Sequence, residues 1–450
     1  MYPVIEKDRM LYLTPEGGTL FVGSLPLQRV NPTAASILEL CNGMYELEDI
    51  CKILAEKYED DPTRVREMVL TFLEESKKRG NIRVNTEKAD ENPLICGNKN
   101  LWVPYYISAE LTKQCDLRCI HCYADAGPPQ VNELSTERWL EILDEFYRLG
   151  CQTVNLTGGD PLAHPDICDI LDFCREKFTV VIPTSGYRID EDMVTKLSSY
   201  KNIEHIQVSL DGPDPETHNK IRGRKDSFQK ATRAITLLSE RGGMTVHVAM
   251  VVLPQNEDKI EDTIKLARKL GAKVFGAGRI YSLGRARGKF SLSRERLIAL
   301  DKKVSDLSKK YSDETFHVKG RDPNQLQQYL FPEDMAPDEI LAYGDILIGL
   351  LGGNCGAGYR SLFVTAEGDV LPCGMMEVCL GNVAETCVEE VLHSFLVRAF
   401  RKIPSPNSET CGDCSNRFLC SGCHALAYMY GEGMPCRWRE IYEECLSCIE

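Results

Sequence analysis

The chain has 450 residues, of which 20 are cysteine, and its formal net charge is −14. A chain of this length is expected to form two or three domains. The acidic balance argues against a general binder of nucleic acids or of membrane surfaces, because such proteins need clustered positive charge. No apolar run approaches about 18 residues, and no apolar N-terminal stretch precedes a small-residue cleavage site. We therefore expect a cytoplasmic protein whose clustered cysteines bind metal instead of forming disulfides.

Residues 1–85 carry no clustered cysteine and are expected to form a domain of their own. Two short apolar runs, 10–13 and 19–23, flank Gly17-Gly18 and predict a hairpin. Three helices are expected after it. The first begins at Asn31-Pro32-Thr33, the second at about Glu46, and the third at Asp61-Pro62-Thr63. Small strands with three helices, closed by a strand at 81–84, indicate a winged-helix-like fold.

Residues 86–100 are polar and are interpreted as a linker. From residue 101 to about 290, β-type runs alternate with helical patterns, which predicts a parallel α/β sheet. The expected strands are 105–110, 153–157, 180–184, 205–209, 245–252 and 274–281, and the expected helices are 136–149, 166–177, 190–198, 227–241 and 259–270. Six such units predict an open, partial (β/α)6 barrel with its chemistry at the carboxyl ends of the strands. Residues 291–350 are expected to be a helical bridging region, and 351–450 a cysteine-rich domain.

Cys115, Cys119 and Cys122 lie just after the first strand of this barrel. Their spacing would fit one face of a helix or an incomplete zinc site. A loop is favoured, because the charged Asp116 and Arg118 stand among the cysteines. Three thiolates would fill three corners of an iron–sulfur cube and leave one iron for a ligand that is not protein.

The run Cys-x3-Cys-x2-Cys resembles the signature of radical S-adenosylmethionine (SAM) enzymes. The resemblance implies that a [4Fe-4S] cluster binds SAM through its open iron. The cluster then cleaves SAM reductively, to give a radical that abstracts a substrate hydrogen. It also implies that His121, which replaces the usual aromatic residue before the last cysteine, helps to hold the adenine.

Further motifs match this family in chain order. Thr157-Gly158-Gly159-Asp160-Pro161 resembles the glycine-rich segment that holds the SAM amino group, with Asp160 where Glu is commoner. Glycine there would allow a close approach to backbone carbonyls. The resemblance further implies ribose contacts from Ser209 and Asp211, a SAM-carboxylate contact from Arg222, and adenine packing by Leu283.

The C-terminal cysteines resemble those of the SPASM domain, which holds two auxiliary [4Fe-4S] clusters. The resemblance implies a distal cluster and a nearer cluster. The distal cluster would be held by Cys411, Cys414, Cys420 and Cys436, and the nearer one by Cys355, Cys373 and Cys423. One residue fewer than usual precedes Cys423, and a double zinc ribbon is the alternative. With the SAM cluster, this makes three [4Fe-4S] clusters.

The nearer cluster is one ligand short in this assignment. Cys379 would fill the fourth position, or the iron would stay open and bind a cysteine thiolate of the substrate. The role of Cys445 and Cys448, a further pair near the end of the sequence, is not fixed by the resemblance.

The N-terminal domain is not expected to read DNA, since its third helix carries Glu67, Glu74 and Glu75 and the chain is acidic. Residues 31–34 and 43–50 instead resemble the peptide-recognition element of peptide-modifying enzymes, which is similar to the small chaperone of pyrroloquinoline quinone synthesis. Such a domain takes a leader peptide as an added strand at a sheet edge.

Together these resemblances imply a radical SAM/SPASM peptide maturase that forms thioethers, of the type that modifies cysteine-rich SCIFF peptides (sactipeptide or ranthipeptide synthases). An external flavodoxin or ferredoxin would supply electrons, with no nucleic-acid or membrane partner. Carbon–carbon cross-linking is one alternative. Sulfatase maturation is another, disfavoured because Gly374 stands where that family has its catalytic aspartate. A non-catalytic electron carrier would have no use for the SAM motifs. The peptide, the acceptor carbon and the oligomeric state are not determined by the sequence.

Overall fold

The computed structural model describes residues 1–22, 25–241, 243–290, 294–320, 356–402 and 425. The described chain divides into two compact units. The first comprises Met1–Tyr105 with Leu149–Cys151, and the second holds the other described residues. None of the described helices is long and apolar enough to cross a membrane.

The first unit contains two small sheets and three helices. Strands β2 (Arg9–Thr14), β3 (Gly17–Val22) and β4 (Leu25–Val30) form an antiparallel meander, while β1 (Tyr2–Ile5) pairs with β5 (Ile82–Asn85). The helices are α1 (Pro32–Leu40), α2 (Leu47–Tyr58) and α3 (Pro62–Lys78). The expected hairpin, the three helices and the closing strand are therefore confirmed.

Local capping chemistry explains where these helices begin. The Asn31 side chain accepts a hydrogen bond from the Ala34 amide at 2.8 Å, and Asp61 accepts from the Thr63 and Arg64 amides at 2.9 and 3.0 Å. Proline follows each cap at the first helical position, where its missing amide hydrogen costs nothing. The apolar faces of the helices pack into one core with β2 and β3.

The expected linker at 86–100 is wrong in part, because it contains strand β6 (Leu94–Gly97). β6 pairs in parallel with β2, so that Cys96 lies opposite Tyr12. The sheet order is β4-β3-β2-β6. The apolar run Leu94-Ile95-Cys96 is too short to predict a strand. The strand forms because β2 offers a pairing partner and because Cys96 becomes buried.

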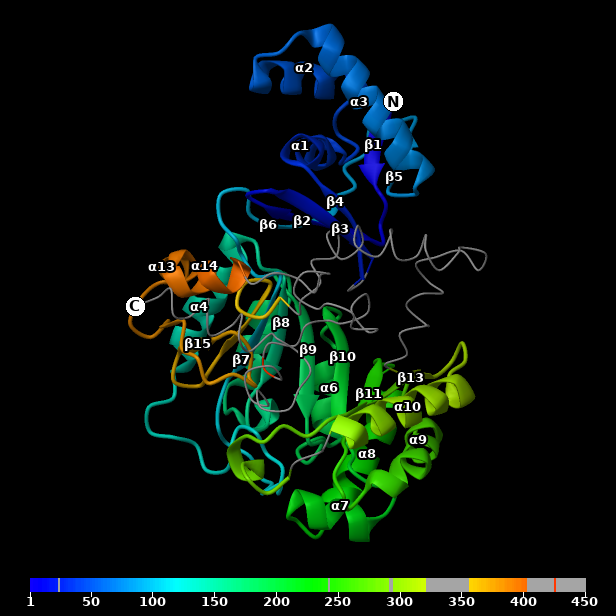
Figure 1. The fold of residues 1–450 in the computed structure, drawn as a ribbon, viewed down its shortest axis with the longest axis vertical. Coiled ribbons are helices and arrows are strands. Elements are labelled where there is room, and N and C mark those ends of the chain that lie inside the picture. The colour runs from blue at the N-terminus through cyan, green and yellow to red at the C-terminus, as the bar shows by residue number, and fades with distance from the viewer. Residues whose placement is uncertain (23–24, 242, 291–293, 321–355, 403–424, 426–450) are drawn as a thin grey trace. The chain divides into compact units, whose positions relative to one another are not determined.

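The second unit contains the predicted parallel α/β sheet (Figure 1). Its strands are β7 (Tyr106–Glu110), β8 (Thr153–Thr157), β9 (Thr179–Thr184), β10 (Ile203–Ser209), β11 (Val246–Val251) and β12 (Val274–Gly278). The helices are α4 (Thr136–Leu149), α5 (Ile167–Cys174), α6 (Glu191–Ser198), α7 (Pro215–Arg222), α8 (Ser227–Glu240) and α9 (Ile260–Lys269). Neighbouring strands in this series pair in parallel in chain order, as the partial (β/α)6 barrel requires.

The two faces of these strands differ in chemistry. In β10, Ile206 and Val208 are buried, whereas Gln207 and Ser209 on the opposite face line a cavity. Because side chains alternate along a strand, the apolar set packs under the helices and the polar set faces the barrel interior. The polar face is the one available for chemistry.

Further strands extend the sheet at both ends beyond the six expected. After α10 (Arg294–Tyr311), β13 (His317–Lys319) pairs with β12, so the region 291–350 is not wholly helical. At the other end β14 (Ser361–Val364) pairs in parallel with β7 and forms an antiparallel series with β15 (Asp369–Leu371) and β16 (Gly381–Asn382). Helices α13 (Val388–His393) and α14 (Phe395–Lys402) follow. The start of the C-terminal domain therefore continues the barrel sheet.

Candidate active site

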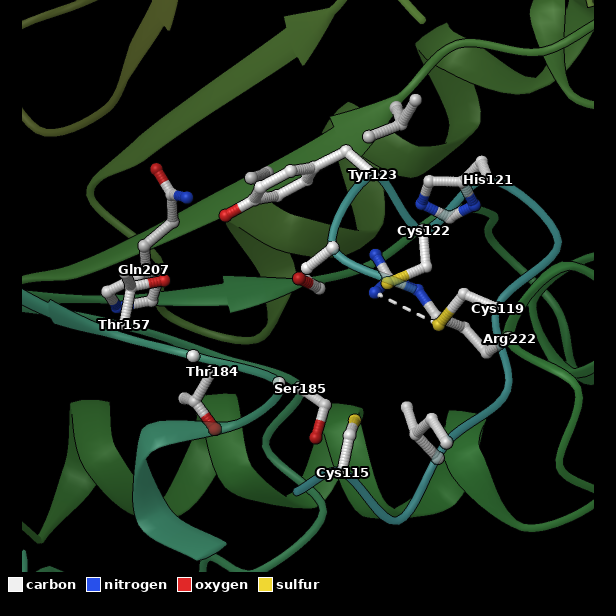
Figure 2. Close-up of a pocket in the computed structure, with 18 of the residues that line it drawn as sticks. Cys115, Cys119, His121, Cys122, Tyr123, Thr157, Thr184, Ser185, Gln207 and Arg222 are labelled. Carbon is white, nitrogen blue, oxygen red and sulfur yellow. Dashed lines mark hydrogen bonds between the residues drawn. The ribbon is translucent and has the colours of Figure 1, made fainter. Parts of the chain in front are cut away.

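A cavity of about 380 Å³ lies at the carboxyl ends of the barrel strands (Figure 2). Its wall brings together residues that the sequence separates by more than a hundred positions. Of the residues expected to act there, it is lined by Cys115, Cys119, His121, Cys122, Gly158, Gly159, Ser209 and Arg222. Asp160, Asp211 and Leu283 do not line it and are buried behind its wall.

The three cysteines of the first cluster lie in a loop, as expected, and not on a helix. The Cys115 amide donates to the Gly127 carbonyl at 2.7 Å, and the Ile120 amide donates to the Ile221 carbonyl at 2.9 Å. The Cys122 carbonyl accepts from the Arg285 amide at 2.9 Å. Contacts at both ends and in the middle therefore fix the course of the loop.

The arrangement of the thiols fits an iron–sulfur cube better than a single metal ion. Within the part of the chain that the structure describes, no three His, Cys, Asp or Glu side chains form a ligand group for one ion. A cube takes one thiolate at each of its iron corners, so its cysteines need not converge on a point. Three thiols around one cavity, with no fourth among the described residues that line it, match a cluster with one open iron.

Gly158 and Gly159 are required by the backbone that leads into the cysteine loop. A Cβ atom on Gly159 would lie 2.4 Å from the Gln114 carbonyl oxygen, and one on Gly158 would lie 2.6 Å from that of Thr112. The Gly159 amide also donates to the Thr112 carbonyl at 2.7 Å. Both glycines therefore pack closely against backbone carbonyls, as expected. These carbonyls belong to the segment that leads into the cysteine loop.

Asp160 fixes the start of the next loop. Its carboxylate accepts hydrogen bonds from the Thr184 hydroxyl at 2.9 Å, the Ser185 amide at 2.9 Å and the Leu162 amide at 3.2 Å, and also from the Ser185 hydroxyl. Burial raises the pKa of Asp160, although these hydrogen bonds oppose that shift. Its acceptor capacity is used within the protein, so in this structure it supports the wall of the cavity.

The two residues predicted to contact ribose, at and just after the end of β10, have different positions. Ser209 lines the cavity, whereas Asp211 is fully buried. The Asp211 carboxylate accepts from the Val251 amide at 2.9 Å and pairs with the Arg222 guanidinium at 2.6 Å. Burial alone would raise the pKa of Asp211, but Arg222 and His121 hold it below its usual value. Ser209 is thus the residue of this motif in position to contact a bound ligand directly.

Arg222 links this buried carboxylate to the cysteine loop. Its side chain is 10 % exposed, and Nη1 donates to the Cys119 sulfur at 3.8 Å (Figure 2). A guanidinium next to a thiolate ligand stabilises negative charge on the sulfur. The contact with the SAM carboxylate that the sequence predicts stays a prediction, and the contact with Cys119 is an addition to it.

His121 lies beside the same network, with Nε2 at 3.6 Å from the Asp211 carboxylate. Burial lowers the pKa of His121 to about 4, which keeps the imidazole neutral near neutral pH. A neutral ring at the cavity wall is compatible with the predicted packing against adenine. Leu283 is buried, and its neighbour Tyr281 lines the cavity in its place.

Two arginines that belong to none of the sequence motifs also hold the cysteine loop. Arg285 donates from Nε to the Cys119 carbonyl at 2.8 Å and from Nη1 to Asp125 at 2.7 Å. Arg188 binds Asp116 through Nε at 2.5 Å and Nη2 at 3.2 Å. Each arginine lies a few residues after the carboxyl end of a strand. Its place after a strand end is the only feature of the sequence that indicates a role at the site.

The C-terminal domain reaches the cavity through Met375, which lies two residues after Cys373. Cys373 is half-buried, while Cys379 is exposed and its thiol contacts the Gly381 carbonyl at 3.3 Å. The other cysteines predicted to hold auxiliary clusters, together with the terminal pair, lie outside the described residues: Cys355, Cys411, Cys414, Cys420, Cys423, Cys436, Cys445 and Cys448.

Three family models match the chain. They are the radical SAM superfamily at residues 109–267, coenzyme PQQ synthesis protein D (PqqD) at 13–82, and an iron–sulfur cluster-binding domain (SPASM) at 355–415. The first model spans the cysteine loop, the two glycines and Arg222. The chain thus contains a radical SAM domain, a PqqD-type domain and a SPASM domain. It therefore binds SAM and [4Fe-4S] clusters, and the cysteine loop is the segment suited to the SAM cluster.

Curated relatives extend over most of the chain. The antilisterial bacteriocin subtilosin biosynthesis protein AlbA of Bacillus subtilis is 28% identical over 440 residues, which cover 94% of this chain and 92% of that protein. The sporulation killing factor maturation protein SkfB of the same organism is 29% identical over 308 residues, 68% of this chain and 69% of that protein.

Solved structures show the same fold. Streptococcus suis SuiB bound to S-adenosylmethionine has a TM-score of 0.64 at 20% identity, and covers 96% of this chain and 97% of that one. SuiB bound to its precursor peptide SuiA gives 0.65 at 19% identity, with 96% of this chain and 98% of that one covered. At these identities the match establishes a shared fold.

Proposed function

We propose that this radical SAM/SPASM enzyme forms intramolecular thioether cross-links in a cysteine-rich, ribosomally made precursor peptide, in the cytoplasm. The observation that carries the proposal is the position of Met375. It brings the segment that holds Cys373 to the same cavity as Cys115, Cys119 and Cys122. A substrate thiol held at Cys373 would thus stand close to the site of hydrogen abstraction. Biosynthesis of the bacteriocin subtilosin by the relative AlbA supports a peptide substrate.

The proposed reaction replaces a C–H and an S–H bond of the peptide by one C–S bond. Cys115, Cys119 and Cys122 would hold the cluster, which together with SAM would supply the abstraction of the carbon's hydrogen atom; SAM would be cleaved to methionine and a nucleoside that keeps this hydrogen. The thiol would lose its proton, and clusters held by the C-terminal domain would take up the one remaining electron. The peptide loses two hydrogens for each link.

The chain's own residues hold this site and shield it. Arg285 and Arg188 fix the cysteine loop, Arg222 donates to Cys119, and Ser209 and Gln207 offer polar groups from β10. Ser209 and Gln207 lie on the cavity face of β10, and the three arginines are held by the hydrogen bonds just described, so these groups are ordered before the substrate binds.

For the nearer auxiliary cluster we propose three protein ligands, Cys355, Cys373 and Cys423, with the fourth iron open to a substrate thiol. Metal binding would deprotonate that thiol and hold it in place. Cys379 is the competing fourth ligand. A distal cluster on Cys411, Cys414, Cys420 and Cys436 completes the proposed total of three [4Fe-4S] clusters.

The PqqD-type unit is proposed to bind the leader of the precursor peptide. Among the described strands, β4 pairs with β3 on one side only and lies at the edge of its sheet. An extended peptide can add to such an edge by backbone hydrogen bonds. The structure of SuiB bound to the precursor peptide SuiA supports a peptide partner.

The decisive experiment incubates the anaerobically reconstituted enzyme with SAM, a reductant and a cysteine-rich peptide encoded near its gene. Thioether formation predicts a loss of about 2 Da for each link, together with a thiol that no longer reacts with an alkylating reagent. A mass loss with all thiols still reactive would indicate carbon–carbon coupling, which is the rival function. SAM cleavage without any peptide change would contradict both.

The open-iron proposal is tested with Cys379→Ala, compared with Cys373→Ala. We expect Cys379→Ala to keep about twelve irons and the cross-linking activity, and Cys373→Ala to lose both an auxiliary cluster and the activity. If Cys379→Ala loses a cluster as well, Cys379 is the fourth ligand.

A further inference from the structure

The surface beside the cysteine loop carries more positive charge than an acidic chain leads one to expect. Residues 220–230 contain five Lys or Arg and one acidic residue, in a protein of net charge −14. Lys220, Arg224 and Lys225 are exposed at the end of α7 and just after it. Arg118, inside the cysteine loop, is exposed as well. We call these four side chains the basic rim.

Backbone contacts join the two segments that supply the rim. The Arg118 amide donates to the Arg222 carbonyl at 3.2 Å. The Arg224 guanidinium donates from Nη1 to the Asp116 carbonyl at 3.1 Å. A Cβ atom on Gly223 would lie 2.5 Å from the Arg118 carbonyl oxygen, which shows how closely the segments pack. The rim is thus one surface that borders the cysteine loop.

Two carboxylates beside the rim are already paired, and three of its four cations form no ion pair with any described residue. Asp116 pairs with Arg188, and Asp226 lies 3.5 Å from Arg224. Within the described part of the chain, Arg118, Lys220 and Lys225 form no ion pair. Uncompensated, exposed cations attract a negatively charged surface at long range, and this attraction weakens as salt is added.

We infer that the basic rim is the docking surface for an acidic electron-donor protein that reduces the SAM cluster. The inference rests on the proposed function to the extent that the cluster on Cys115, Cys119 and Cys122 must be reduced in every turnover. In this step the donor loses one electron and the oxidised cluster gains it. Charge complementarity selects a small acidic redox protein, because transient redox encounters bury little area and depend on electrostatic steering.

The test measures the rate at which flavodoxin hydroquinone, an acidic one-electron donor, reduces the cluster of the reconstituted enzyme in a stopped-flow instrument. The variant is Lys220→Glu/Lys225→Glu, because both lysines are exposed and, among the described residues, neither side chain is hydrogen-bonded to Cys115, Cys119 or Cys122. Its control is Lys269→Glu/Lys273→Glu, which changes the net charge equally. Lys269 and Lys273 are exposed and lie at the amino end of β12, whereas the cysteine loop follows the carboxyl end of β7.

At low ionic strength we expect the second-order rate constant to fall about tenfold in the rim variant and to change less than about twofold in the control. Added salt should slow the wild type and leave the rim variant nearly unchanged. Reduction by dithionite, a small-molecule donor, should be the same in all three proteins. The inference would be overturned if flavodoxin reduced the rim variant and the control at equal rates. It would also be overturned if the rim variant lost as much rate with dithionite as with flavodoxin. Because no peptide is present, the result is independent of thioether formation.

Discussion

The carboxyl ends of β8 and β10 both carry a buried aspartate, but the two aspartates bind different kinds of partner. Asp160 after β8 accepts hydrogen bonds from the neutral groups of Leu162, Thr184 and Ser185. Asp211 after β10 pairs with Arg222, which contacts the sulfur of Cys119. The end of β8 therefore shapes the site, whereas the end of β10 places charge next to a cluster ligand.

The largest expected effect comes from Gly159→Ala at the end of β8. The new Cβ would lie 2.4 Å from the Gln114 carbonyl oxygen and 2.5 Å from that of Lys113, so the cysteine loop must shift. We expect loss of most of the SAM cluster and a roughly hundredfold lower rate of SAM cleavage, since a small misplacement of reacting groups has that effect. Iron content and release of the nucleoside product are the measurements.

The control for this variant is Gly276→Ala, whose Cβ would meet nothing nearer than Lys319 Cδ at 3.8 Å. It should retain iron and activity. Normal iron content and SAM cleavage in Gly159→Ala would show that the end of β8 does not shape the cysteine loop.

The second prediction compares the aspartates directly. Asp211→Asn leaves the buried Arg222 without its counter-charge and should lower the free energy of unfolding by about 3–5 kcal/mol. Asp160→Asn removes acceptors from neutral donors and should cost about 1–3 kcal/mol. Denaturant unfolding of both variants under anaerobic conditions measures the difference. Equal losses would mean that the two strand ends do not differ in electrostatic role.

The third and smallest effect is on reduction potential. Arg222→Lys keeps the charge that pairs with Asp211 but removes the guanidinium hydrogen bond to the Cys119 sulfur. Because hydrogen bonds to cluster sulfurs raise the potential, we expect the SAM cluster to become harder to reduce. Its midpoint potential, followed by electron paramagnetic resonance, should shift to a more negative value.

Arg188→Lys is the matched control, since Arg188 holds the same loop through Asp116 and touches no cysteine sulfur. The potential of this variant should stay at the wild-type value. A shift of the same size in both variants would assign the effect to movement of the loop and not to the hydrogen bond.

Local sequence patterns were sufficient for much of the fold. Asn31-Pro32 and Asp61-Pro62 marked helix starts that depend on the cap residue alone, and five of the six predicted barrel strands lie within two residues of their observed ends. The last strand was predicted to run to Tyr281 but ends at Gly278. Patterns of this kind are read over a few neighbouring residues, and so they do not depend on the rest of the fold.

Pairing with distant partners was beyond the sequence. β6 and β13 are each only three or four residues long, and exist because β2 and β12 offer free edges. The division of the predicted site residues into those that line the cavity and those buried behind it also depends on distant partners. The sequence by itself determined which residue types carry the chemistry and that they follow strand ends. Only the tertiary structure decided that Ser209 faces the cavity while Asp160 and Asp211 are buried behind its wall, because the partners of those carboxylates, among them Ser185 and Arg222, come from other segments of the chain.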